Sequence, residues 1–108
     1  MNSKRKGNGG ELELLHRFHA MGFPCYRNDQ RYIGGKDNPD LCLTVNGQEY
    51  HVEVKRTERF RLYEAMEQAI QDAGGKRVPV VLHRRNRGEW MAILRLEDFL
   101  KTAGRNTG

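Results

Sequence analysis

The chain has 108 residues, a formal net charge of +5 at pH 7 and a pI near 9.5. This length suits one domain over residues 1–108, and no apolar run approaches the roughly 18 residues that a membrane-spanning helix needs. The excess of basic residues, most of them arginine, indicates an acidic partner, with nucleic acid as the first candidate. The basic start has no apolar signal-peptide region behind it, and two cysteines do not make a disulfide framework. We therefore expect a cytoplasmic protein.

The first half of the chain begins with a predicted helix. Apolar side chains at a helical period predict it over residues 10–21, and Gly22 then acts as a stop signal. An extended segment follows at 23–27, and residues 34–39 have the composition of a loop. We expect residues 1–9 to be flexible, because their composition is that of a loose chain end.

A hairpin is the clearest local pattern. Leu41–Val45 alternates between apolar and polar residues, Asn46-Gly47 follows, and Tyr50–Val54 alternates again. Asn-Gly between two alternating runs is a strong hairpin signal, because both turn positions need a positive φ.

The second half continues the alternation of helices and strands. The patterns predict a helix at 60–73 that ends at Gly74, strands at 78–83 and 90–94, and a closing helix at 97–103, with 104–108 flexible. The order of helix, strands, helix, strands and helix predicts an α/β fold with one central mixed sheet flanked by helices.

Glu11 is an unusual residue for its position in the first predicted helix. At about 100° per residue it lies at the centre of the apolar face, between Leu15 and Phe18. An unpaired carboxylate directed at a core is unfavourable. Either Glu11 is placed in the first turn, near the positive end of the helix, or it reaches a cation. Glu13 lies nearly opposite, where it can pair with Arg17.

The hairpin register brings two further carboxylates together. A two-residue loop at Asn46-Gly47 places Asp40 opposite Glu53, and Lys55 projects from the same side of the sheet. Facing carboxylates repel each other unless a cation lies between them. Two acids that hold Mg²⁺, with a lysine beside them, would suit phosphodiester cleavage. Lys55 could then orient or deprotonate water or stabilise the transition state. The alternative is that Asp40 caps a turn while Glu53 and Lys55 are surface charges on an exposed sheet face.

These residues also match a known pattern. Pro39-Asp40, a strand, a turn and then Glu53-Val54-Lys55 resembles the active-site motif of the PD-(D/E)xK nuclease superfamily. The segment from Lys6 to Glu11, with Gly22-Phe23 after it, is similar to the first helix of the Holliday-junction-resolvase branch. The resemblance covers most of the chain and implies a restriction-endonuclease-like core.

The resemblance also implies roles for five residues. Glu11, Asp40 and Glu53 would be catalytic acids at a metal site for Mg²⁺ or Mn²⁺. The carbonyl of Val54 would be a further metal ligand. Lys55 would be the catalytic lysine.

The function implied is a Mg²⁺-dependent DNA endonuclease, a hydrolase acting on duplex or branched DNA in recombination or repair. A junction cutter nicks two strands symmetrically, which favours a homodimer. The small size also suits a phage or mobile element. Gln68 is the nearest candidate for a glutamine that recurs on the next helix of relatives. The residues expected to contact DNA, besides Gln68, are Lys4, Lys6, Arg56, Arg59, Arg61, Arg84, Arg85 and Arg87. The alternatives are a non-catalytic nucleic-acid-binding module on the same fold and, third, an RNA substrate.

Overall fold

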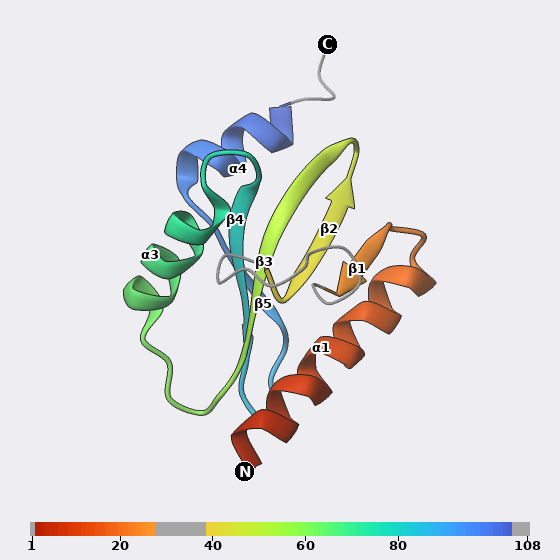
Figure 1. The fold of residues 1–108 in the computed structure, drawn as a ribbon, viewed down its shortest axis with the longest axis vertical. Helices are drawn as coiled ribbons and strands as arrows, with labels where there is room; N and C mark the ends of the chain where they lie inside the picture. The colour runs from red at the N-terminus through yellow and green to blue at the C-terminus, as the bar shows by residue number, and fades with distance from the viewer. Residues whose placement is uncertain (1, 28–38, 105–108) are drawn as a thin grey trace.

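The computed structural model describes residues 2–27 and 39–104 and confirms the α/β class (Figure 1). Of the predicted loop at 34–39, residues 34–38 lie outside the described residues, as do the last four residues of the chain. In chain order the elements are α1 (Asn2–Ala20), β1 (Cys25–Arg27), β2 (Leu41–Val45), β3 (Gln48–Arg56), α3 (Leu62–Ala73), β4 (Val78–Arg84), β5 (Met91–Ile93) and α4 (Leu96–Ala103).

The first helix begins earlier than its sequence pattern predicts. It starts at Asn2 instead of residue 10, so the segment expected to be loose is helical. Each glycine in this segment disfavours a helix by only about 1 kcal/mol. The later turns of α1 are docked on the sheet through Gly10 and Leu14, and a docked helix extends more easily than a new one forms. Tertiary packing therefore outweighs composition here.

The five strands form one mixed sheet in the order β1-β2-β3-β4-β5. Only β3 and β4 run parallel, and α3 is the crossover between them. The hairpin register is the predicted one, with Leu41 opposite Val52 and Leu43 opposite Tyr50. Asn46 and Gly47 have φ values of 52° and 80°, as a two-residue hairpin turn requires.

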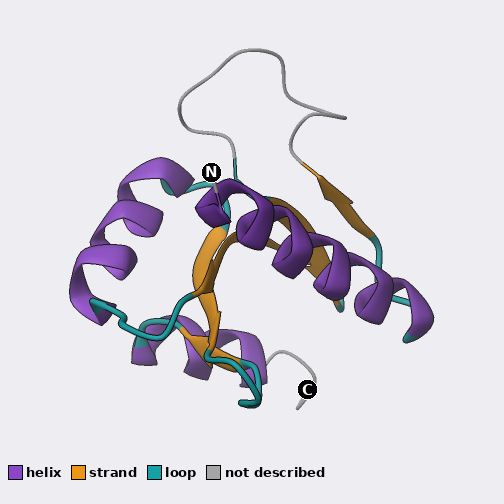
Figure 2. Ribbon diagram, turned by 90° about the horizontal axis from the view of Figure 1, so that it is seen from below, coloured by secondary structure: helices purple, strands orange, loops and turns teal. Residues whose placement is uncertain are grey.

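Helices cover both faces of the sheet (Figure 2). On one face, α1 packs against a core whose buried members are Leu14, Cys25, Leu41, Leu43, Val52, Val54, Val80 and Leu82. On the other face, α3 packs Met66 and Ala69 against Val81. Since β3 alternates between these faces, Glu53 and Lys55 project on the α3 side, where Glu53 is half-buried and Lys55 is exposed.

Helix α3 (Leu62–Ala73) begins two residues later than the predicted 60–73 and is buried along a narrow stripe. Met66, Ala69 and Ala73 are buried, whereas Tyr63 in the first turn is 80% exposed. Because Ala69 and Ala73 have small side chains, the later turns of α3 can approach the sheet closely, and the buried residues lie on these turns. The helix ends at Gly74, which adopts φ 64° as expected for a left-handed cap.

The closing helix α4 has no buried residue. It lies at the opposite end of the long axis from the start of α1 (Figure 1). No helix in residues 2–27 and 39–104 has the length and apolar character needed to cross a membrane.

Candidate active site

Asp40 is fixed where the chain enters β2. Pro39 before it is fully buried, and the Asp40 Oδ2 atom accepts a hydrogen bond of 2.8 Å from the backbone N–H of Val54. This bond joins the start of β2 to β3 just beyond the last paired residues of the hairpin. Asp40 therefore caps the end of the hairpin, and its carboxylate is held beside the Glu53–Lys55 segment.

The environment of Asp40 disfavours its charged form. Burial raises the pKa of Asp40 to about 7, and repulsion from Glu53 acts in the same direction. The Val54 N–H lowers the pKa, Glu11 raises it further and Lys55 lowers it. Glu53, Glu11 and Lys55 therefore each influence the charge of Asp40.

Glu53 is held in place by a histidine that the sequence pattern did not single out as functional. The Glu53 Oε2 atom lies 2.8 Å from Nε2 of His51, and the His51 side chain is completely buried. The side chain of Glu53 is 15% exposed, so it can still reach a ligand from solvent. The hydrogen bond restricts the rotamer of Glu53.

Lys55 opens onto a pocket beside α3. This pocket has a volume of about 400 Å³ and is lined by Lys55, Thr57, Arg59, Phe60, Arg61, Glu64, Ala65 and Gln68. Gln68 therefore lies on the same pocket as the candidate catalytic lysine, although it is outside the buried stripe of α3. Its amide donates to the Oδ1 atom of Asp72 at 3.0 Å.

Glu11 reaches a cation, which is one of the two outcomes predicted for it. Its Oε1 atom lies 3.5 Å from Arg27 of β1. Gly10 before it allows α1 to approach the sheet closely, because a Cβ at this position would lie 3.3 Å from Val54 Cγ1. The predicted Glu13–Arg17 pair does not form. Glu13 accepts instead from Arg84 and Trp90 across the core, at 3.4 Å and 3.0 Å.

Four exposed arginines lie on two neighbouring segments at one end of the molecule. The 57–61 segment contacts the β4–β5 turn, since His83 bonds the Thr57 carbonyl at 2.9 Å and the Asn86 N–H donates to Glu58 at 2.6 Å. Figure 1 places both segments at the end where α1 begins. The arginines exposed on these segments are Arg59, Arg61, Arg85 and Arg87.

Two other arginines are less accessible. Arg84 bonds to Glu13 and lies over the ring of Trp90, 5.6 Å from its centroid, and its side chain is only 16% exposed. Arg56 is half-buried, and its Nε has no hydrogen-bond partner. The side chains of Lys4 and Lys6 lie outside the described part of the chain.

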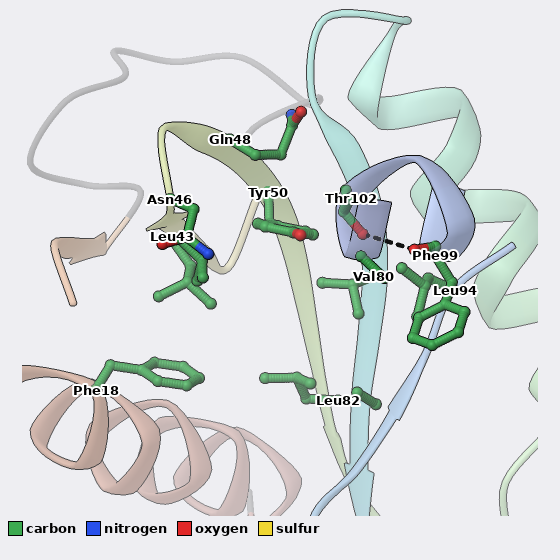
Figure 3. A pocket seen from close by; sticks show the side chains of 13 residues that line it. Phe18, Leu43, Asn46, Gln48, Tyr50, Val80, Leu82, Leu94, Phe99 and Thr102 are labelled. Atoms are coloured by element: carbon green, nitrogen blue, oxygen red, sulfur yellow. Dashed lines mark hydrogen bonds between the residues drawn. The ribbon is translucent and has the colours of Figure 1, made fainter. Parts of the chain in front are cut away.

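A second pocket, on the face covered by α1, differs in character. It has a volume of about 410 Å³ and is lined by apolar side chains from the sheet and from two helices. Phe18 of α1 and Phe99 of α4 lie at its edges, and Tyr50 of β3 is on its floor (Figure 3). This pocket contains no carboxylate, so it is not a second acidic site.

Two residues beside the candidate site, His51 and Asp72, were not predicted from the sequence to have a functional role. His51, Glu53 and Asp72 each offer a ligand atom, and these three atoms lie within 4.8 Å of one another. His51 alternates with apolar residues and resembles an ordinary core position, whereas Asp72 is one of several polar residues on α3. Only the docking of α3 on β3 brings them together.

Comparison with known proteins supports the fold. No family model matches the chain, and none of the curated proteins matches it. Among solved structures, it is similar to Hjc of Archaeoglobus fulgidus, a Holliday junction resolvase from an archaeal hyperthermophile. The TM-score is 0.63 at 24% identity, over 82% of this chain and 72% of that one. The chain thus has the fold of a resolvase-type nuclease.

Proposed function

We propose that the protein is a divalent-metal-dependent DNA endonuclease of the PD-(D/E)xK type that acts on branched DNA. The observation that carries this proposal is the environment of Asp40. A half-buried carboxylate faces a second carboxylate, Glu53, and the nearest lysine, Lys55, points into a pocket lined by arginines. Such an arrangement is unfavourable in the absence of a cation, which is typical of functional sites.

The donor set fits a hard divalent cation. Asp40 and Glu53 would supply carboxylate oxygens, the Val54 carbonyl would be a backbone ligand, and Glu11 acts electrostatically on Asp40. Mg²⁺ prefers oxygen ligands of this kind, and Mn²⁺ accepts the same ones. When bound, the ion would supply positive charge where negative charge develops on the phosphate.

The protein's own residues would then orient the reactants. Water would lose a proton to solvent and add its oxygen to phosphorus, the phosphodiester P–O bond would break, and the leaving oxygen would take up a proton. The ammonium group of Lys55 stabilises the charge that develops on the phosphate oxygens. His51 keeps Glu53 in one rotamer, and the Val54 N–H does the same for Asp40.

The distribution of basic residues supports binding of a nucleic acid backbone. Arg59 and Arg61 line the Lys55 pocket, and the exposed Arg85 and Arg87 lie on the neighbouring turn. Contacts from arginine to phosphate position a duplex without reading its sequence. Arg84 is committed to Glu13 and Trp90, so we assign it a structural role at this surface.

A homodimer would complete the structure-selective function. Two symmetric nicks need two active sites, and a twofold interface supplies them. The apolar pocket beside α4 and the exposed Phe99 and Leu96 on that helix form an apolar surface that a second copy would cover. This surface is at the far end from the basic segments, so a second copy would leave both DNA-binding ends open.

The test compares cleavage of a four-way junction, a linear duplex and the matching RNA duplex by the full chain. Mg²⁺, Mn²⁺ or EDTA is added to each. We expect metal-dependent cleavage of DNA, faster on the junction, and none in EDTA. Binding without cleavage under every metal condition would favour the non-catalytic module instead. Equal cleavage of junction and duplex would remove the selectivity for branched DNA.

A further inference from the structure

We propose that His51, Glu53 and Asp72 form a second cation site, selective for a transition metal such as Mn²⁺, Co²⁺ or Zn²⁺ over Mg²⁺. It lies between β3 and α3 and shares Glu53 with the site proposed above. The inference rests on the proposed function and deepens it, because it concerns a second ion beside the first.

The first observation is the geometry of the three side chains. One ligand atom from each lies within 4.8 Å of the other two, and the His51 Nε2 to Glu53 Oε2 separation is 2.8 Å. Ligands bound at about 2.1 Å to a common ion lie roughly 3–4 Å apart. Small side-chain adjustments therefore bring all three atoms onto one ion.

The second observation is independent of the acids. His51 is completely buried, its ring is directed at Glu53, and its Nδ1 atom has no hydrogen-bond partner. The Nε2 atom faces Glu53, so it is the ring nitrogen that would ligate the ion, and Nδ1 would then hold the ring proton. Imidazole is a common ligand of transition metals, whereas Mg²⁺ favours oxygen-only sites.

The third observation is the balance of charge. The carboxylates of Glu53 and Asp72 lie close together, and neither is within ion-pair distance of a lysine or an arginine among the described residues. Gln68 donates its amide to Asp72 Oδ1, which fixes this carboxylate and leaves its second oxygen for a ligand. Carboxylates that ligate metals are commonly held by such outer hydrogen bonds.

The experiment measures Mn²⁺ bound to the full-length chain by pulsed electron paramagnetic resonance, with affinity from a titration. Nitrogen hyperfine coupling reports an imidazole ligand directly, and it does not depend on DNA cleavage. We expect this coupling in the wild type and its loss in His51→Gln. Asp72→Asn should weaken Mn²⁺ binding about tenfold or more. Glu67→Gln is the matched control, because it removes an exposed acid from the same helix.

The outcomes separate this proposal from the proposed nuclease activity. Absence of nitrogen coupling in the wild type, or its persistence in His51→Gln, overturns the second site. If His51→Gln does not fold, Asp72→Asn decides, and unchanged affinity in that variant overturns the site. Asp40→Asn should retain the nitrogen-coupled Mn²⁺. A chain that shows the nitrogen coupling but cleaves no DNA has the second site without the proposed function. A chain that cleaves DNA but shows no nitrogen coupling has the proposed function without the second site.

Discussion

The two pockets of nearly equal volume differ in what surrounds them. The pocket beside α3 contains Lys55 and lies next to Asp40 and Glu53, whereas the pocket beside α4 is lined almost entirely by apolar side chains. In the first, burial and like charge disfavour the apo state of the site. In the second, apolar surface remains exposed on a helix with no buried residue. The difference is the basis for the two proposals above, that the first region binds a cation and that the second is covered by another copy of the chain.

Removal of the lysine should have the largest effect. Lys55→Ala should reduce the rate of DNA cleavage by about 10²–10³-fold, because it removes the positive group nearest the developing charge. Initial rates on a labelled four-way junction in Mg²⁺ measure this. Lys76→Ala, at an exposed lysine on the turn after α3, is the matched control and should cleave at the wild-type rate. Equal rates for the two variants would remove Lys55 from the site.

Asp40 should make the apo protein less stable as the pH rises. Its folded pKa of about 7 lies above the ordinary value of 3.8, so the folded state holds its proton longer than the unfolded state. The free energy of unfolding should therefore decrease between about pH 4 and pH 7. Asp40→Asn keeps the shape without the charge, so it should raise the melting temperature at pH 8 in EDTA. The two proteins should differ much less at pH 4.

This stability comparison has a clear contrary result. If Asp40→Asn is less stable than the wild type at pH 8, the charged carboxylate stabilises the fold. Its burial is then not an unfavourable contribution that a bound metal ion would offset. Thermal unfolding followed by circular dichroism at both pH values is sufficient. Asp98→Asn on α4, a carboxylate that pairs with Arg95, serves as the reference substitution.

A charged substitution on the apolar surface of α4 should change the oligomeric state of the protein. Phe99→Arg places a charge on the surface proposed to bind a second copy, so it should convert a dimer to a monomer in light scattering. Tyr63→Arg is the matched control, because Tyr63 is an exposed aromatic on α3, on the opposite face of the sheet. A wild-type monomer at high concentration would contradict the dimer, and so would dissociation by the control alone.

The smallest effect is expected from the exposed arginines of the β4–β5 turn. The double variant Arg85→Gln/Arg87→Asn removes both arginines. The slope of the logarithm of DNA affinity against the logarithm of salt concentration should become shallower by about one for each phosphate that the turn no longer neutralises. Asparagine suits residue 87, which has a φ of 63°. Arg95→Gln, near α4, should leave the slope unchanged. If both proteins show the wild-type slope, the turn does not bind DNA.

Much of the acidic site follows from local sequence rules. The Asn46-Gly47 turn fixes the register of β2 and β3, and that register brings Asp40 beside Val54 at the end of the hairpin. The two residues that lie beside Glu53, namely His51 and Asp72, could not be predicted from local sequence rules. His51 and Asp72 meet only because α3 docks on one face of β3, which is a long-range contact that no spacing encodes.

The first helix shows the same limit. Its glycines suggested a loose chain end, whereas the segment is helical and Gly10 lets α1 approach Val54 of the sheet closely. The apolar surface of α4 was also not predicted, because its amphipathic pattern is that of any helix packed on a core. Local geometry could thus be predicted from the sequence, but the surfaces created by docking could not.

The most direct test of the account is the rate of four-way junction cleavage by Asp40→Asn beside the wild type, in Mg²⁺ and in EDTA. The wild type should cleave only in Mg²⁺, and the folded variant should lose this cleavage almost completely. Cleavage by Asp40→Asn at the wild-type rate, or wild-type cleavage that continues in EDTA, would contradict a metal-dependent site built on Asp40.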